Sequence, residues 1–253
     1  MSLQSAIEWT DATWNPVTGC TEVSPGCDHC YARTFAERFR GVTGHPYEQG
    51  FDLKLWPERL EYPLQWKKPR RIFTNSMSDL FHKDVPDDFI FQVFDIMAQA
   101  NWHTFQVLTK RPARLARLVP RISERLRRYS GHLAPWPDQI WLGVSIETMQ
   151  YSWRAEQLRR VPAAVRFISA EPLLGSLKQL DLTDIHWLIA GGESGRGHRP
   201  CDPAWVHELR DRCIESGTAF FFKQWGGRTP KTGGRLLDGR TWDDYPQLTP
   251  VSL

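Results

Sequence analysis

Seven short apolar segments, separated by stretches with helical patterns, constrain the fold of this chain more than any other feature. Most of them are continuous apolar runs without clean alternation, which is typical of strands buried on both faces of a parallel sheet. They cover residues 7–14, 71–75, 104–109, 140–145, 165–169, 186–190 and 219–223. Because parallel strands need a crossover between them, these segments predict an α/β fold with mainly parallel strands.

Helical patterns between these strands complete repeated βα units. They cover residues 31–40, 87–98, 152–158 and 203–215. The last one has Asp202 as a candidate N-cap and Pro203 at the first helical position. Seven strands in one chain favour a TIM-like (β/α) barrel, complete or partial, over a Rossmann pair. We expect residues 1–253 to form one domain, with residues 228–253 as a tail that wraps the surface.

The composition excludes several classes of protein. The chain has 253 residues, of which 41% are hydrophobic and 24% charged, so it is neither disordered nor fibrous. No apolar run approaches the roughly 18 residues of a membrane span, and the N-terminus lacks a basic-then-apolar signal pattern. We therefore expect a cytoplasmic protein without a membrane partner, and nothing indicates its oligomeric state. Five cysteines in such a protein do not predict a disulfide framework.

Polar residues follow most of the predicted strands, at the point where each strand ends. In a parallel barrel the chemistry sits at these carboxyl ends, which meet at one rim. Capping of the following helices explains some of these residues. It explains the charged ones less well, because a charge beside a buried sheet is costly unless it is paired or used. We therefore predict a polar pocket at the rim, formed by Asn75, Ser76, Ser78, Asp79, Lys110, Ser145, Glu147, Ser169, Glu171, Gly191, Gly192, Glu193 and Lys223.

Three cysteines, Cys20, Cys27 and Cys30, fall within eleven residues just after the first predicted strand. Two cysteines separated by two residues can bind one metal centre, and the short loop lets the third close on it at little entropic cost. Two centres suit this set: zinc completed by His29 or His82, or a [4Fe–4S] cluster with one open iron. Unrelated buried cysteines or a redox pair are the alternative. Placement at the rim favours a functional metal site.

Six motifs spread over residues 13–227 resemble the phage Gp37/Gp68 protein family. The motifs are TWNPVTGC, SPGCDHCYA, FTNSMSDLFH, SAEPLLG, IAGGESG and FFFKQWGG. That family is itself similar to radical S-adenosylmethionine enzymes, including the spore photoproduct lyase group. The resemblance implies a barrel of the radical S-adenosylmethionine type and an enzyme, a lyase or oxidoreductase, that modifies or repairs a nucleic acid or nucleotide, as in DNA repair.

The resemblance also implies cofactors and site residues. Cys20, Cys27 and Cys30 would hold a [4Fe–4S] cluster whose open iron chelates S-adenosylmethionine. Reduction by an external electron donor would then release a 5′-deoxyadenosyl radical. As catalytic groups we expect Glu147, Glu171, Glu193 and Lys223. The expected contacts to S-adenosylmethionine are Tyr31, Asn75, Ser76, Ser78, Asp79, Lys110, Ser145, Ser169, Gly191 and Gly192.

The chain departs from the usual radical S-adenosylmethionine pattern at three places. Six residues, not three, separate Cys20 from Cys27. His29 stands where an aromatic residue usually precedes the last cysteine, although Tyr31 follows it. The GGE sequence follows the sixth predicted strand, whereas the usual methionine-binding loop follows the second.

Residues 110–128 form a strongly basic segment with eight basic residues and one acid, Glu124. One interpretation is a solvated outer helix whose long side chains cover apolar surface. The other is a face that contacts the phosphates of a nucleic acid. The arginines recur at helical spacing, interrupted by Pro120, and are Arg114, Arg117, Arg121, Arg125 and Arg128.

Two other functions remain open from the sequence. The first is a zinc- or iron-dependent hydrolase or lyase without redox chemistry, in which Glu147, Glu171 or Glu193 acts as the base. The second is a nucleic-acid-binding module whose metal is purely structural.

Overall fold

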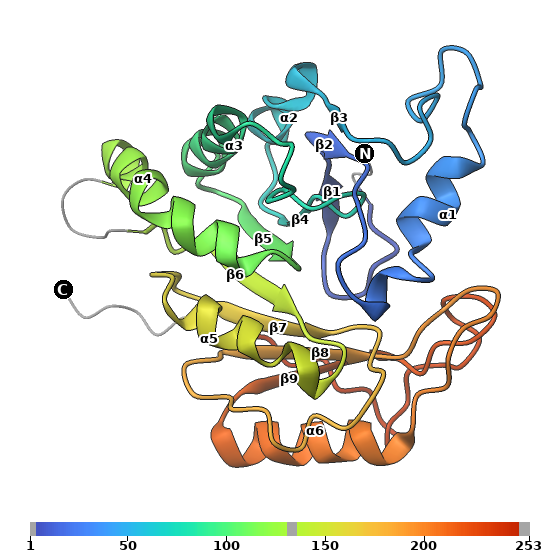
Figure 1. The fold of residues 1–253 in the computed structure, drawn as a ribbon. Helices are drawn as coiled ribbons and strands as arrows, with labels where there is room; N and C mark the ends of the chain where they lie inside the picture. The colour runs from blue at the N-terminus through green and yellow to red at the C-terminus, as the bar shows by residue number, and fades with distance from the viewer. Residues whose placement is uncertain (1–3, 131–135, 248–253) are drawn as a thin grey trace.

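A curled sheet of seven parallel strands forms the centre of the molecule, seen here in a computed structural model that describes residues 4–130 and 136–247 (Figure 1). The strands pair in chain order, each parallel to the next. In the described residues the first and last strands do not pair, so the sheet is an open half-barrel and the predicted barrel is partial. The strands are β1 (Ala12–Trp14), β4 (Arg71–Thr74), β5 (Thr104–Thr109), β6 (Ile140–Ser145), β7 (Arg166–Ala170), β8 (Trp187–Gly191) and β9 (Ala219–Gln224).

Crossover segments connect these strands. The helices are α1 (Tyr31–Glu37), α2 (Tyr62–Gln65), α3 (Asp87–Gln99), α4 (Pro112–Ser130), α5 (Trp153–Arg159) and α6 (Pro203–Ser216). Short 3-10 turns cover Pro25–Cys27, Pro57–Arg59 and Met149–Tyr151, and β2 (Val17–Thr18) pairs with β3 (Lys54–Leu55) in a separate antiparallel ribbon. Asp202 caps α6 as predicted, since its side chain accepts the N–H of Ala204. None of the described helices is long and apolar enough to cross a membrane.

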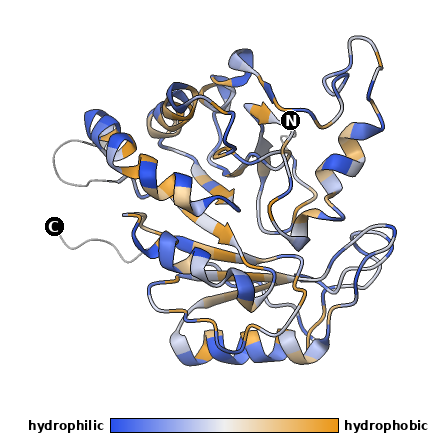
Figure 2. Ribbon diagram, viewed as in Figure 1, coloured by the Kyte–Doolittle hydropathy of each residue, from blue (hydrophilic) through white to orange (hydrophobic). Residues whose placement is uncertain are grey.

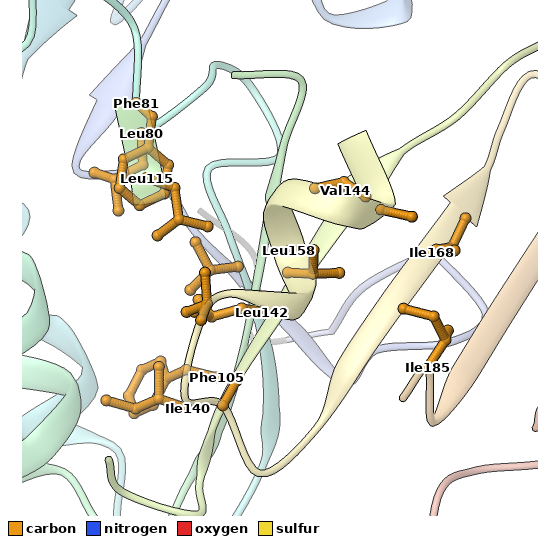
Figure 3. Packing of buried hydrophobic residues seen from close by; sticks show 14 of the residues in the cluster. Leu80, Phe81, Phe105, Leu115, Ile140, Leu142, Val144, Leu158, Ile168 and Ile185 are labelled. Atoms are coloured by element: carbon orange, nitrogen blue, oxygen red, sulfur yellow. The ribbon is translucent and has the colours of Figure 1, made fainter. Parts of the chain in front are cut away.

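The outer face of the sheet carries the larger apolar layer, built from alternate strand residues and the inner faces of the helices. In Figure 3, Leu115 of α4 and Leu158 of α5 gather with Leu142 of β6 in this layer. Figure 2 shows hydrophobic strands at the centre and hydrophilic residues on the outer sides of the helices. The sequence interpretation that Pro120 interrupts the basic helix is wrong. Because Pro120 is exposed and removes only one N–H, the buried leucine face keeps α4 continuous across it.

The inner face of the half-barrel is filled by aromatic rings at the amino-terminal halves of the strands. Trp187 is central, with ring centroids 6.1 Å from Trp9 and Trp141 and 5.7 Å from Phe167. Gly143 of β6 is required here, because a Cβ at that position would lie 2.4 Å from the ring of Phe167. The tryptophans at this end therefore fill the inside of the half-barrel.

Two differences from the predicted boundaries matter for the site. The first strand covers only Ala12–Trp14, because residues 5–10 turn across the inner face and place Trp9 there. The tail, described as far as Gln247, runs back along β9: Phe222 N–H donates to Trp242 O at 2.9 Å and Asp244 N–H to Phe220 O at 3.2 Å. Residues 248–253 of the predicted tail lie outside the described residues.

Candidate functional site

A cavity of about 380 Å³ opens at the carboxyl ends of the strands, where the polar residues were predicted to meet. Its inner end is apolar, formed by Ile7, Trp9, Phe73 and Leu108. Two of the predicted rim residues, Glu147 and Gly191, do not line it. The predicted residues that do line it are Tyr31, Asn75, Ser76, Ser78, Asp79, Lys110, Ser145, Ser169, Glu171, Gly192, Glu193, Lys223 and the three cysteines Cys20, Cys27 and Cys30.

The three cysteines lie on one loop, residues 20–30, which we call the cysteine loop and which covers one wall of the cavity. Cys20 and Cys30 are partly buried and pack against a small apolar cluster of Ala32, Ala36 and Phe51. Within the described residues, no three His, Cys, Asp or Glu side chains are gathered tightly enough to hold a single metal ion. The thiols share one cavity, but they do not form a ready single-ion site.

The two histidines considered as a fourth zinc ligand are already engaged. His82 Nε2 lies 2.9 Å from Thr21 Oγ1, and its Nδ1 accepts the N–H of Asp84. His29 Nδ1 lies 2.8 Å from Glu193 Oε2. A [4Fe–4S] cluster with one open iron takes one cysteine on each of its other three irons, so it would need three thiols and no histidine. The donor set therefore fits such a cluster better than it fits zinc.

Glu147 has a different environment from the one predicted for a catalytic base. Its side chain is 0% exposed and contacts Ser24 and Gly26 of the cysteine loop. Ser24 Oγ donates to its Oε1 at 2.7 Å, and Arg154 Nη1 donates to its Oε2 at 3.0 Å. Lys110 Nζ lies 3.7 Å from Oε1. Both oxygens are thus occupied within the protein, one of them by Ser24 of the cysteine loop, and, contrary to the prediction from the sequence, Glu147 does not line the cavity.

Glu193 of the GGE sequence is also held in an ionic network. It accepts the backbone N–H of Arg199 at 2.8 Å and the guanidinium at 2.5 and 3.0 Å. Burial by itself raises the pKa of Glu193, but hydrogen bonds from Arg199 and His29 outweigh it and lower the pKa to about 2. A carboxylate stabilised in this way is a poor proton acceptor at neutral pH, so the network does not suit the predicted role of a base.

Glu171 and Lys223 form an ion pair on the cavity wall, with Lys223 Nζ 2.9 Å from Glu171 Oε2. Ser169 Oγ donates to the other oxygen of Glu171 at 3.3 Å. Gly191 leaves room for this carboxylate, because a Cβ there would lie 3.3 Å from its Oε2. This pair remains partly exposed to the cavity. It is the arrangement of predicted catalytic groups best placed to contact a bound molecule.

The residues after β4 mostly bind other parts of the fold. Asn75, in the left-handed region with a φ of 64°, donates to Val17 O, and Asp79 accepts Thr109 Oγ1 at 2.7 Å. Tyr31 OH donates to Ser76 O. In the described part of the chain, Asn75 Oδ1 and Ser145 Oγ are buried without a partner. Since unsatisfied buried polar atoms are costly, these two are candidates to contact a ligand.

The arginines predicted to contact phosphates lie along α4 on the outside of the half-barrel. Arg114 donates to Asp87 and to the carbonyl groups of His82 and Val85. Arg125 pairs with Asp95 at 2.6 Å, and Arg121 lies over the ring of Phe91. Three of the five therefore bind neighbouring residues of the fold, whereas Arg117 and Arg128 are exposed.

Sequence reasoning missed three arginines that support the site: Arg111, Arg154 and Arg199. Arg111 Nη2 donates to Thr21 O at 2.9 Å and lies 3.6 Å from Cys20 Sγ. Arg154 carries a signal that sequence reasoning did not use, because it stands four residues before the buried Leu158, on the apolar face of α5. Arg199 lies in a loop, where its spacing gives no signal.

Comparisons with known proteins agree with this fold. A cysteine-to-serine variant of spore photoproduct lyase superposes with a TM-score of 0.50 at 15% identity, over 94% of this chain and 66% of the lyase chain. Another variant of that lyase, with bound AdoMet and dinucleoside spore photoproduct, gives a TM-score of 0.47 at 13% identity, over 80% of this chain and 61% of the lyase chain. The chain thus spans about 61–66% of the length of these lyases.

At this level of identity, the likeness shows the fold alone. No curated protein matches the chain in sequence. The model of a family described as a protein of unknown function, DUF5131, matches residues 4–246. The chain therefore belongs to the DUF5131 family of phage Gp37/Gp68-like proteins.

Proposed function

We propose that this protein is an iron–sulfur enzyme of the radical S-adenosylmethionine type that acts on a nucleic acid or a nucleotide. One observation carries the proposal: the three thiols and the polar strand ends line the same cavity. Catalytic groups of parallel α/β barrels lie at this end of the sheet. The half-barrel fold, shared with spore photoproduct lyase, is consistent with the proposal.

Different residues of this chain would bind the cluster and the S-adenosylmethionine. Cys20, Cys27 and Cys30 would hold the cluster, and Cys20 and Cys30 pack against the apolar residues Ala32, Ala36 and Phe51. When bound, such a cluster supplies the electron, taken from an external donor, for reductive cleavage of S-adenosylmethionine. Lys223 and Glu171 offer a cation and an anion to a bound amino acid group, which carries both charges. Asn75 Oδ1 and Ser145 Oγ offer further hydrogen bonds.

The proposed substrate, a nucleic acid or a nucleotide, has weaker support. The exposed Arg117 and Arg128 remain available for phosphates, and DNA repair is one reaction that fits. Tyr31 is 56% exposed beside the cavity and presents a ring on which a base can stack.

The test is anaerobic reconstitution of the protein with iron and sulfide. We expect visible charge-transfer absorbance that is lost in Cys27→Ala and retained in the control Cys201→Ala, since Cys201 does not line the cavity. Reduction with dithionite in the presence of S-adenosylmethionine should then yield 5′-deoxyadenosine. If the protein binds stoichiometric zinc and shows no such absorbance, the proposed iron–sulfur cluster is wrong. A cluster that yields no 5′-deoxyadenosine would overturn the radical step.

A further inference from the structure

We propose that Glu147 and Glu193 are positioning residues that fix the cysteine loop from its two sides, so that the loop keeps its shape before any cofactor binds. The proposal goes beyond the function above and rests on it only where the cluster is concerned. Six residues separate Cys20 from Cys27, and even a segment of this length has several conformations unless side chains hold it.

The first anchor reaches the loop from the end of β6. Glu147 accepts the hydroxyl of Ser24 at 2.7 Å, inside the six-residue segment. Gly26 packs directly on the same carboxylate, because a Cβ there would lie 2.5 Å from its Cγ and Oε1. Arg154, 1% exposed, compensates the buried charge at 3.0 Å. A fully buried and charge-balanced carboxylate is a rigid support, since it cannot rotate without leaving the Arg154 cation unpaired.

The second anchor reaches the loop from the segment after β8. Arg199 is fixed by Glu193 and extends to the loop, where it donates to Pro25 O at 2.8 Å and to Asp28 at 3.1 Å. His29, between Cys27 and Cys30, pairs with the same Glu193 at 2.8 Å. Contacts from β6 and β8 therefore fall on both sides of Cys27. This explains why two predicted catalytic carboxylates are fully occupied within the protein itself.

The test of this role must separate loop shape from overall stability. In the metal-free protein, we would measure amide hydrogen exchange by mass spectrometry together with the alkylation rate of Cys27 and Cys30. The variant Ser24→Ala removes the contact to Glu147 and leaves the ion pair with Arg154 intact. The variant Ser24→Thr keeps the hydroxyl, and Glu156→Gln changes an exposed carboxylate on the same helix as Arg154.

For Ser24→Ala we expect exchange of residues 21–30 and alkylation of Cys27 to rise roughly 10-fold, the usual size for a lost hydrogen bond to a charged group. Exchange in β5 and β6 should stay unchanged, Ser24→Thr should restore the wild-type rates, and Glu156→Gln should have no effect. Unchanged loop exchange in Ser24→Ala, or an increase spread equally over β6, would overturn the proposal.

A second measurement separates a failure of the positioning role from a failure of the proposed function. After anaerobic reconstitution, the wild type and Ser24→Ala are compared by iron content and by the electron paramagnetic resonance spectrum of the reduced protein. We expect Ser24→Ala to bind iron with a shifted spectrum. If the wild type forms no cluster, the proposed function fails, while the exchange data still decide the role of the anchors. If both proteins give one spectrum and one exchange pattern, the positioning role fails alone.

Discussion

The two ends of the inner face of the half-barrel are built from the same strands but from different chemistry. At the amino-terminal end, Trp187 and its neighbours Trp9 and Phe167 pack against one another and leave little room. At the carboxyl end the same strands end in Ser145, Ser169 and Lys223, which line a cavity. On β7 the packing residue Phe167 lies two positions before Ser169, and on β9 Phe221 lies two positions before Lys223.

From this difference we expect substitutions at the amino-terminal end to affect stability and substitutions at the carboxyl end to affect chemistry. Trp187 and Phe167 do not line the cavity, so they serve the fold, whereas Trp9 also closes the inner end of the cavity. At the cavity wall the Glu171–Lys223 ion pair is only partly buried, so it should add less to stability than the aromatic cluster does. The following predictions test this division, beginning with the largest effect.

The largest loss of stability is expected at the aromatic end. Trp187→Ala removes a fully buried ring from the centre of the cluster, which should lower the free energy of unfolding by about 3–5 kcal/mol. Urea denaturation followed by circular dichroism measures this loss. The exposed Trp153→Ala is the control and should change stability little. If Trp187→Ala lowers the free energy of unfolding by less than about 1 kcal/mol, the aromatic end is not the main source of stability and the proposed division is wrong.

A smaller, pH-dependent loss is expected in the Glu193 network. The folded-state pKa of Glu193, about 2, lies below its ordinary value of 4.5, so its stabilisation is fully present above pH 4.5 and is lost as the pH falls towards 2. Glu193→Gln should therefore cost on the order of 2–3 kcal/mol at pH 7. The difference from the wild type should shrink towards zero near pH 2. Urea titrations at several pH values measure it, with the exposed Glu215→Gln as control. A pH-independent difference would contradict this account.

At the cavity wall, chemistry should change more than stability. Lys223→Met removes the partner of Glu171 but keeps a long side chain, so stability should fall by only about 1 kcal/mol. The yield of 5′-deoxyadenosine should fall at least roughly 10-fold, because the bound amino acid group loses its cation. Thermal unfolding and product analysis by chromatography are measured on the same sample. Full activity in this variant would show that the amino acid group does not bind at the Glu171–Lys223 pair.

The smallest effect is expected on the outer face of α4. Arg117→Gln should change stability by less than about 0.5 kcal/mol, because Arg117 is exposed. If this face contacts phosphates, binding of a labelled single-stranded oligonucleotide should weaken, and its salt dependence should decrease by about one unit of slope. Fluorescence anisotropy at several salt concentrations measures both. Arg114→Gln, which breaks contacts within the fold, should instead lower stability.

The strand pattern could be predicted well because buried parallel strands are continuous apolar runs. β5 and β6 have the predicted bounds, Thr104–Thr109 and Ile140–Ser145. The first strand was predicted too long, because residues 7–10 have a composition suited to a strand. Their true role, placing Trp9 inside the half-barrel, depends on contacts with Phe73 and Trp187 that are distant in sequence.

The candidate site could be predicted as a set of residues, but not as a set of roles. The position of a residue at a strand end predicts that it meets the others at the rim, and most of them line the cavity. A carboxylate at a strand end can face the cavity or bind an arginine inside the protein. Which of the two occurs depends on whether an arginine lies nearby in the fold, and the sequence spacing did not predict Arg154 or Arg199. Glu147 and Glu193 thus contact Arg154 and Arg199, which the sequence spacing did not indicate.

The antiparallel run of the tail along β9 has a consequence for the behaviour of the protein at high concentration. An open sheet has exposed edges, and an unpaired edge strand is a template for pairing with another chain. Residues 242–244 occupy the backbone groups of Phe220 and Phe222 on the outer edge of β9. The strand next to them reads AFFFKQ, a hydrophobic sequence that would favour aggregation if its edge were uncovered. The tail thus covers part of an edge that would otherwise be open to pairing with another chain.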